Sequence, residues 1–92
     1  MNGNNLTQDI RFNPHQVRRA GLKSTVEAKI LRYLADGPTD RKSLARLFDL
    51  RTVEHLEQIG LVVYHNGHVA ITEAGLETLR RCLGKEHGRG VA

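Results

Sequence analysis

Residues 44–60 read LARLFDLRTVEHLEQIG, and this stretch decides the fold. Apolar residues recur at helical spacing in both halves, and we expect them to face the core: Leu44, Ala45, Leu47, Phe48, Val53, Leu56 and Ile59. Gly60 supplies the left-handed conformation that ends a helix cheaply. The pattern therefore predicts a helix over about 40–48 and a short helix over 51–59, joined at a sharp corner.

A tight hairpin is expected directly after this corner. The runs LVVYH (61–65) and HVAI (68–71) are rich in β-branched residues. Asn66-Gly67 separates them, and this pair is the strongest signal for a two-residue turn that needs positive φ at both positions. His65 and His68 should then be cross-strand neighbours on the exposed face of the hairpin.

A capping box opens the helix that precedes the corner. The Ser24 hydroxyl and the Glu27 carboxylate are expected to accept backbone N–H groups reciprocally. Four apolar residues at spacings of three and four are expected to form its core face: Val26, Ile30, Leu31 and Leu34. Gly37-Pro38 ends this helix.

Two further helices flank this set. Asn13 as a cap and Pro14 at the first helical position predict a short helix over about 14–20. Thr72 caps a last helix whose core residues recur at helical spacing: Leu76, Leu79 and Leu83.

The chain of 92 residues is long enough for one hydrophobic core, and its 39% hydrophobic and 26% charged residues are typical of a globular protein. We expect a flexible arm over 1–12, one domain over 13–83 and a flexible basic tail over 84–92. The single cysteine, Cys82, excludes an intramolecular disulfide and favours a reducing cytoplasm. No apolar run is long enough for a membrane span, so we expect none.

The net charge of +4 belongs to the two ends of the chain. Residues 1–23 and 79–92 each hold four basic side chains against one acidic, whereas residues 24–78 hold six basic against eight acidic. Lys and Arg neutralise phosphates, so basic ends favour a nucleic-acid partner. The ends are expected to supply salt-dependent backbone or minor-groove contacts through Arg11, Arg18, Arg19 and Arg89.

Three segments resemble the winged helix-turn-helix superfamily. Residues 44–48 look like the first helix of the motif, residues 53–62 (VEHLEQIGLV) look like a recognition helix running into a wing, and residues 71–75 (ITEAG) look like the start of the next helix. The match over about 24–83 is similar to small bacterial and phage regulators of the MarR and PadR kind. It implies a mainly α fold with a small antiparallel β-hairpin, and a DNA-binding transcription regulator whose helix 51–59 reads the major groove. Here the recognition helix and the wing are both unusually short.

The candidate DNA-binding residues lie on the outer face of helix 51–59, at the start of the preceding helix and at the hairpin tip. They are Arg41, Lys42, Arg46, Arg51, Thr52, His55, Gln58, His65, Asn66 and His68. Arg suits guanine, Gln suits adenine, and the cations of helix 40–48 suit phosphates. Glu54 and Glu57 are unfavourable near phosphates unless they accept from cytosine or pair with a neighbour such as Arg51.

A second interpretation stays open: the domain is a protein–protein interaction module with little DNA affinity. A DNA regulator is expected to be a homodimer through its first and last helices, because one short helix reads only a few base pairs. No nucleophile, base and acid form a recognisable motif, so we expect no enzyme and no cofactor. His65 and His68 lack a third ligand at metal spacing, so we expect no metal site.

Overall fold

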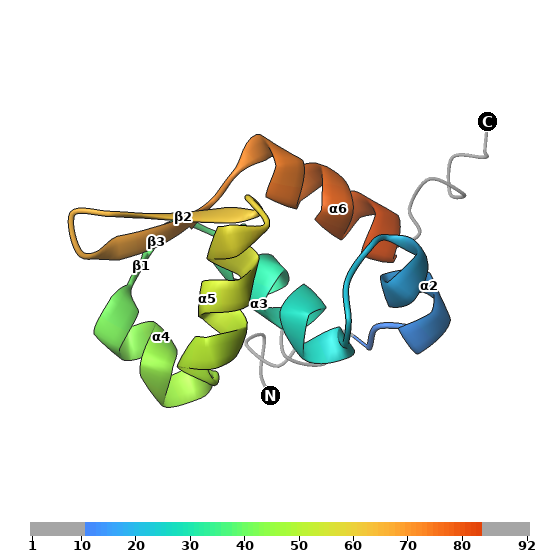
Figure 1. Cartoon of the computed structure of the whole chain (residues 1–92), viewed down its shortest axis with the longest axis horizontal. Coiled ribbons are helices and arrows are strands. Elements are labelled where there is room, and N and C mark those ends of the chain that lie inside the picture. The colour runs from blue at the N-terminus through green and yellow to red at the C-terminus, as the bar shows by residue number, and fades with distance from the viewer. Residues whose placement is uncertain (1–10, 84–92) are drawn as a thin grey trace, which may run out of the picture.

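The computed structural model describes residues 11–83, which are mainly helical with a small three-stranded antiparallel sheet (Figure 1). The predicted tail over 84–92 and all of the predicted arm except Arg11 and Phe12 lie outside these residues. The elements follow in the order α2 (Pro14–Arg19), α3 (Thr25–Leu34), β1 (Thr39–Asp40), α4 (Arg41–Leu47), α5 (Leu50–Gln58), β2 (Val62–His65), β3 (His68–Ile71) and α6 (Glu73–Leu83).

The predicted hairpin is confirmed, and it belongs to a larger sheet than expected. Asn66 (φ 52°) and Gly67 (φ 79°) both have positive φ, and His65 pairs with His68 across the turn. The strand order is β1-β3-β2, with Thr39 opposite Val69 and Asp40 opposite His68. The two residues of β1 are too few to show an alternating pattern, so the sequence predicts only the two-stranded hairpin.

The core is assembled around α3, which packs against α2, α5, α6 and β3. The largest fully buried side chains of the core come from α2, α3, α4, α5 and β3: Val17, Ile30, Leu31, Leu34, Leu44, Val53, Leu56 and Val69. Each contributes about 1.5–3 kcal/mol by leaving water. Phe12, which the sequence places in the arm, is also buried, so the packed domain begins one residue earlier than predicted.

Four predicted core residues are solvent-exposed instead. Val26 is 41% exposed, Leu47 55% and Ile59 44%, and Ala45 is exposed as well. In the first turn of α3, Glu27 and Ala28 form the buried side and Val26 points away from it. In the two-turn helix α4, only Leu44 is buried, so its other apolar residues remain at the surface.

The prediction of a reciprocal capping box at the start of α3 is wrong. Ser24 makes no side-chain capping hydrogen bond, and Glu27 Oε1 accepts from the backbone N–H of Lys23 at 2.8 Å. The other carboxylate oxygen of Glu27 lies 2.8 Å from His55 Nδ1 on α5. A long-range partner therefore draws this carboxylate into the interior, where the side chain is 4% exposed.

The residues 71–75 (ITEAG) join α6 to the rest of the domain. Thr72 Oγ1 donates to the carbonyl of Gly60 at 2.8 Å and accepts from the N–H of Gly75 at 3.0 Å, which confirms Thr72 as the cap. A Cβ on Gly75 would overlap the carbonyl oxygen of Leu61 and lie 2.6 Å from Ile71 Cγ1. Only glycine therefore lets α6 approach the α5–β2 junction this closely.

None of the helices in residues 11–83 is long and apolar enough to cross a lipid bilayer. The longest, α6, has eleven residues, or about 16 Å of helix against a hydrocarbon core of about 30 Å.

Candidate nucleic-acid interface

The outer face of α5 carries a stripe of four polar side chains, Arg51, Glu54, His55 and Gln58, which we call the α5 stripe. Spacings of three and four place them on one side of the helix, opposite the buried Val53 and Leu56. Asp49 caps the N-terminus of the helix, since its Oδ1 accepts from the backbone N–H of Arg51 at 3.0 Å. The stripe is thus presented by a capped helix on a packed core.

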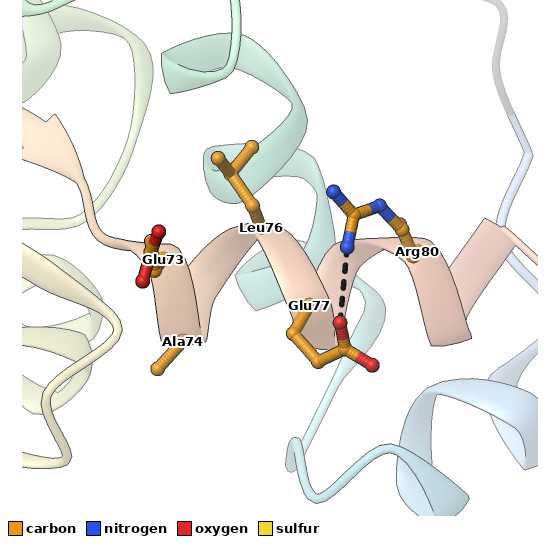
Figure 2. A pocket seen from close by; sticks show the side chains of 5 residues that line it. All are labelled: Glu73, Ala74, Leu76, Glu77 and Arg80. Atoms are coloured by element: carbon orange, nitrogen blue, oxygen red, sulfur yellow. Dashed lines mark hydrogen bonds and ion pairs between the residues drawn. The ribbon is translucent and has the colours of Figure 1, made fainter.

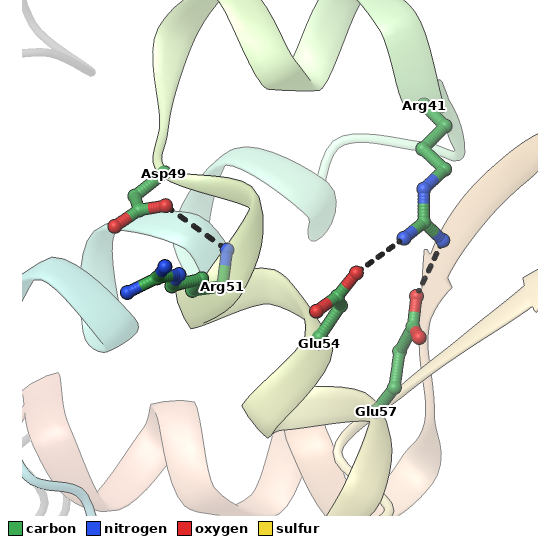
Figure 3. Close-up of polar contacts among 5 residues, drawn as sticks. All are labelled: Arg41, Asp49, Arg51, Glu54 and Glu57. Atoms are coloured by element: carbon green, nitrogen blue, oxygen red, sulfur yellow. Dashed lines mark hydrogen bonds and ion pairs between the residues drawn. The ribbon is translucent and has the colours of Figure 1, made fainter.

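Arg41 on α4 forms ion pairs with both glutamates of α5 (Figure 3). Its Nη2 lies 3.2 Å from Glu54 Oε2 and its Nη1 lies 3.2 Å from Glu57 Oε2. The guanidinium also lies over the ring of Tyr64 on β2, 4.6 Å from its centroid. Arg41 therefore joins α4, α5 and β2.

This arrangement changes the roles expected from sequence. The expected partner of the glutamates was Arg51, but Arg51 points away from the cluster and Arg41 takes that place. These two contacts compete with phosphate for the Arg41 guanidinium. The two acidic side chains of α5 thus share one basic partner within the chain, which compensates one of their two charges.

His55 is also engaged by another helix. Its Nδ1 lies 2.8 Å from Glu27 Oε2 on α3, and the His55 side chain is 29% exposed. This contact turns the ring toward α3 and away from the centre of the α5 stripe. The contact with Glu27 therefore competes with the predicted contact of His55 with DNA.

The remaining candidates are available to a partner. Lys42, Arg46, Arg51 and Gln58 are exposed, and Thr52 is half-buried. Within residues 11–83, the side chains of Lys42, Arg46, Arg51 and Gln58 make no hydrogen bond or ion pair.

At the hairpin tip His65, Asn66 and His68 are all exposed. His68 Nδ1 lies 3.1 Å from the carbonyl oxygen of Asn66, which holds that ring against the turn. Between the tip and α4 lies a hollow of about 310 Å³. It is lined by Asp40, Arg41, Lys42, Ala45, Leu50, Tyr64 and Gly67.

Two residues that shape this surface, Glu27 and Tyr64, were not predicted as site residues from the sequence. Glu27 was treated as a local cap and Tyr64 as an ordinary strand residue, because their partners are 28 and 23 positions away along the chain. An acid in the first turn of a core helix and an aromatic in a short strand carry no local signal of such contacts.

Among the described residues, no group of three or more His, Cys, Asp or Glu side chains could hold a metal ion. A second hollow of about 470 Å³ lies on the outside of α6 and is lined by that helix alone (Figure 2). Neither finding identifies a catalytic centre.

Comparison with protein-family models, with characterised proteins and with solved structures found no match to this chain.

Proposed function

We propose that the protein is a DNA-binding transcription regulator of winged helix-turn-helix type, which inserts α5 into the major groove. The order α3, β1, α4, α5, β2, β3 supports this assignment, since a helical pair followed by a paired ribbon is the arrangement that the resemblance implies. α5 is 9 residues long, so it spans about 13 Å and contacts only a few base pairs.

One observation carries the proposal: the glutamates of α5 are engaged by Arg41, whereas its Arg and Gln side chains are free of such contacts within residues 11–83. Glu54 is drawn toward Arg41 and His55 toward Glu27, whereas Arg51 and Gln58 remain exposed. Arg is well matched to O6 and N7 of guanine, and Gln to N6 and N7 of adenine. Arg51 and Gln58, seven residues apart, are our base-reading pair.

Other residues would fix the domain on the duplex without reading its sequence. Lys42 and Arg46 on α4 are placed to contact phosphates, and His65, Asn66 and His68 approach the backbone from the hairpin tip. Thr52 at the edge of the stripe contacts a thymine methyl or a phosphate. A homodimer through α2 and α6 doubles these contacts on a two-fold symmetric site. The free thiol of Cys82 suits a reducing cytoplasm.

The test is a selection of bound duplexes from a random pool, followed by titration of the selected and random sequences. We expect Arg51→Ala and Gln58→Ala each to reduce the preference for the selected site by about tenfold, the value of one good bidentate contact. Lys29→Ala removes a charge from the exposed side of α3 and is the matched control, which should leave the preference unchanged. An empty selection, or an equal loss of preference in the control, would overturn the proposal.

The alternative is a protein–protein interaction module, and exposed apolar side chains on α4 and β2 favour it. Leu47 is 55% exposed, Val63 48% and Tyr64 49%. Binding to random duplex between 50 and 200 mM salt separates the two functions, because a DNA-binding protein loses affinity steeply over this range. Negligible binding at both salt concentrations would favour the interaction module.

A further inference from the structure

The strongest concentration of unbalanced charge lies at the end of the molecule farthest from the hairpin. Arg18 and Arg19 form the last turn of α2, Lys23 follows it, and Arg80 and Arg81 lie in the last turn of α6. All five side chains are exposed. We call this group the α2–α6 pole.

The two helices that carry the pole are packed together. α2 contacts α6, and Figure 1 shows α2 beside the C-terminal end of α6, at the opposite end of the longest axis from the hairpin. Val17 of α2 and Cys82 of α6 belong to one buried cluster. Packing therefore fixes the two helices that carry the pole, while its side chains extend into solvent.

Few acidic side chains accompany these cations. Residues 11–23 contain no Asp or Glu. Glu77 is the acidic partner of the pole, and Figure 2 shows its contact with Arg80. Its carboxylate lies 3.0 Å from Arg80 Nη1 and 3.7 Å from Arg81 Nε. Both pairs are exposed, with side chains 53–68% accessible, so they hold the arginines weakly.

The chemistry of the pole points to a phosphate backbone as its partner. Four of the five cations are arginines, whose planar guanidinium groups bind phosphate through paired hydrogen bonds. Arg also occurs at protein interfaces, where aromatic anchors often accompany it, and basic clusters are attracted to anionic membranes, where surface helices insert apolar side chains. Within residues 11–83, α2 and α6 expose no large hydrophobic side chain, and duplex DNA requires none.

We propose that the α2–α6 pole is a second DNA-binding surface, which contacts phosphates independently of sequence. It supplies affinity at one end of the molecule while α5 supplies sequence preference elsewhere. A dimer interface over the pole would bring like charges together, so the homodimer proposed above should use residues of α2 and α6 outside it. The pole does not depend on α5, and it can bind DNA even if α5 does not.

The first test measures binding of the full chain to a random duplex from 50 to 200 mM salt. In the double variant Arg18→Ala with Arg19→Ala, log affinity should fall less steeply with log salt. The slope should become less negative by about 1.8, or about 0.9 for each phosphate that the protein no longer neutralises. Lys29→Ala with Arg32→Ala on α3 removes the same charge and is the matched control. An equal change in both double variants would mean that net charge alone attracts DNA, and would overturn the proposal.

The second test is a gain of binding, which a variant that merely fails to fold cannot give. Glu77→Gln releases Arg80 and Arg81, so it should raise the random-duplex affinity and steepen the salt slope. An unchanged or lower affinity in Glu77→Gln would overturn the proposal. Vesicles of anionic lipid should not bind the protein at salt concentrations where the duplex does; binding to vesicles without binding to the duplex would assign the pole to a membrane.

The two proposals fail separately. Variants of the pole should weaken selected and random duplexes equally and keep the preference between them. Variants of Arg51 and Gln58 should remove the preference and keep most of the random-duplex binding. An empty selection with intact pole-dependent binding would overturn the role of α5 and leave the pole in place.

Discussion

The two ends of the molecule use charge in opposite ways. From Thr39 to Ile71, which includes α4, α5 and the hairpin, the chain holds four basic and four acidic residues. Arg41 is paired with two of those acids. The α2–α6 pole holds five cations with Glu77 as their one acidic partner among the described residues. A surface that balances its charges attracts DNA little and leaves discrimination to individual side chains, whereas an unbalanced surface attracts any duplex.

The ends also differ in how firmly their side chains are held. Glu54 and His55 have partners on neighbouring helices, so two of the four side chains of the α5 stripe are held in place before any ligand arrives. The arginines of the pole extend into solvent, where contact with phosphate needs no defined geometry. Preorganisation suits recognition, since less conformational entropy is lost on binding.

The largest expected effect is at Gly75, where α6 packs against the α5–β2 junction. Gly75→Ala places a Cβ against the Leu61 carbonyl, and neither backbone can move without disturbing the α5–β2 junction. We expect a loss of about 3 kcal/mol in the free energy of unfolding, measured by urea denaturation. Ala74→Gly, one residue earlier and exposed, is the control and should cost about 1 kcal/mol. Similar losses for both would mean that α6 is not closely docked.

The second-largest effect tests whether α2 and α6, the helices that carry the pole, are closely packed together. Burial raises the pKa of the Cys82 thiol to about 11 from 9.0. At neutral pH the native thiolate fraction should be about 100-fold below that of the unfolded chain, and alkylation should be correspondingly slow. Because the folded state holds its proton more tightly, the stability contributed by the thiol is complete below pH 9 and is lost as the pH rises towards 11. Rapid alkylation of the native protein would contradict the packing of α2 on α6.

Local patterns predicted the elements of this fold well. Asn66-Gly67 identified the hairpin because positive φ is a property of those two residues. Thr72 was identified as a cap because a cap needs only its own next turn. The exposure of Leu47 and Ile59 could not be foreseen, since it depends on which side of a short helix meets the core.

The candidate site was less predictable, because its decisive contacts are long-range. Arg41, Glu54 and Glu57 are all visible in the sequence, but their pairing depends on how α4 and α5 meet. The same holds for the contact of Glu27 with His55. A helical pattern indicates which residues face outwards, and it carries no information about which of them are already engaged.

A smaller effect tests the ordering of the α5 stripe. His55→Ala leaves one oxygen of the buried Glu27 carboxylate without its partner, so we expect a loss of about 2 kcal/mol in the free energy of unfolding. Glu27→Gln in the His55→Ala background should recover part of that loss, because an amide carries no charge to be compensated. Arg80→Ala at the pole is the control and should change stability by less than about 0.5 kcal/mol, since its ion pair is exposed. Equal effects of His55→Ala and Arg80→Ala would remove the contrast in order between the two ends.

The smallest effect tests the contrast in charge directly. Glu54→Gln with Glu57→Gln removes both carboxylates from Arg41 and gives the α4–α5 end a net positive charge. The freed guanidinium can then neutralise one more phosphate, so the salt slope for random duplex should steepen by about 0.9. Preference for a selected site should fall, because the added attraction is the same for every sequence. Asp36→Asn, which frees Arg32 on α3, changes the charge elsewhere and should leave both quantities nearly unchanged. If Asp36→Asn steepened the slope as much, the acids of α5 would have no special part in limiting non-specific binding.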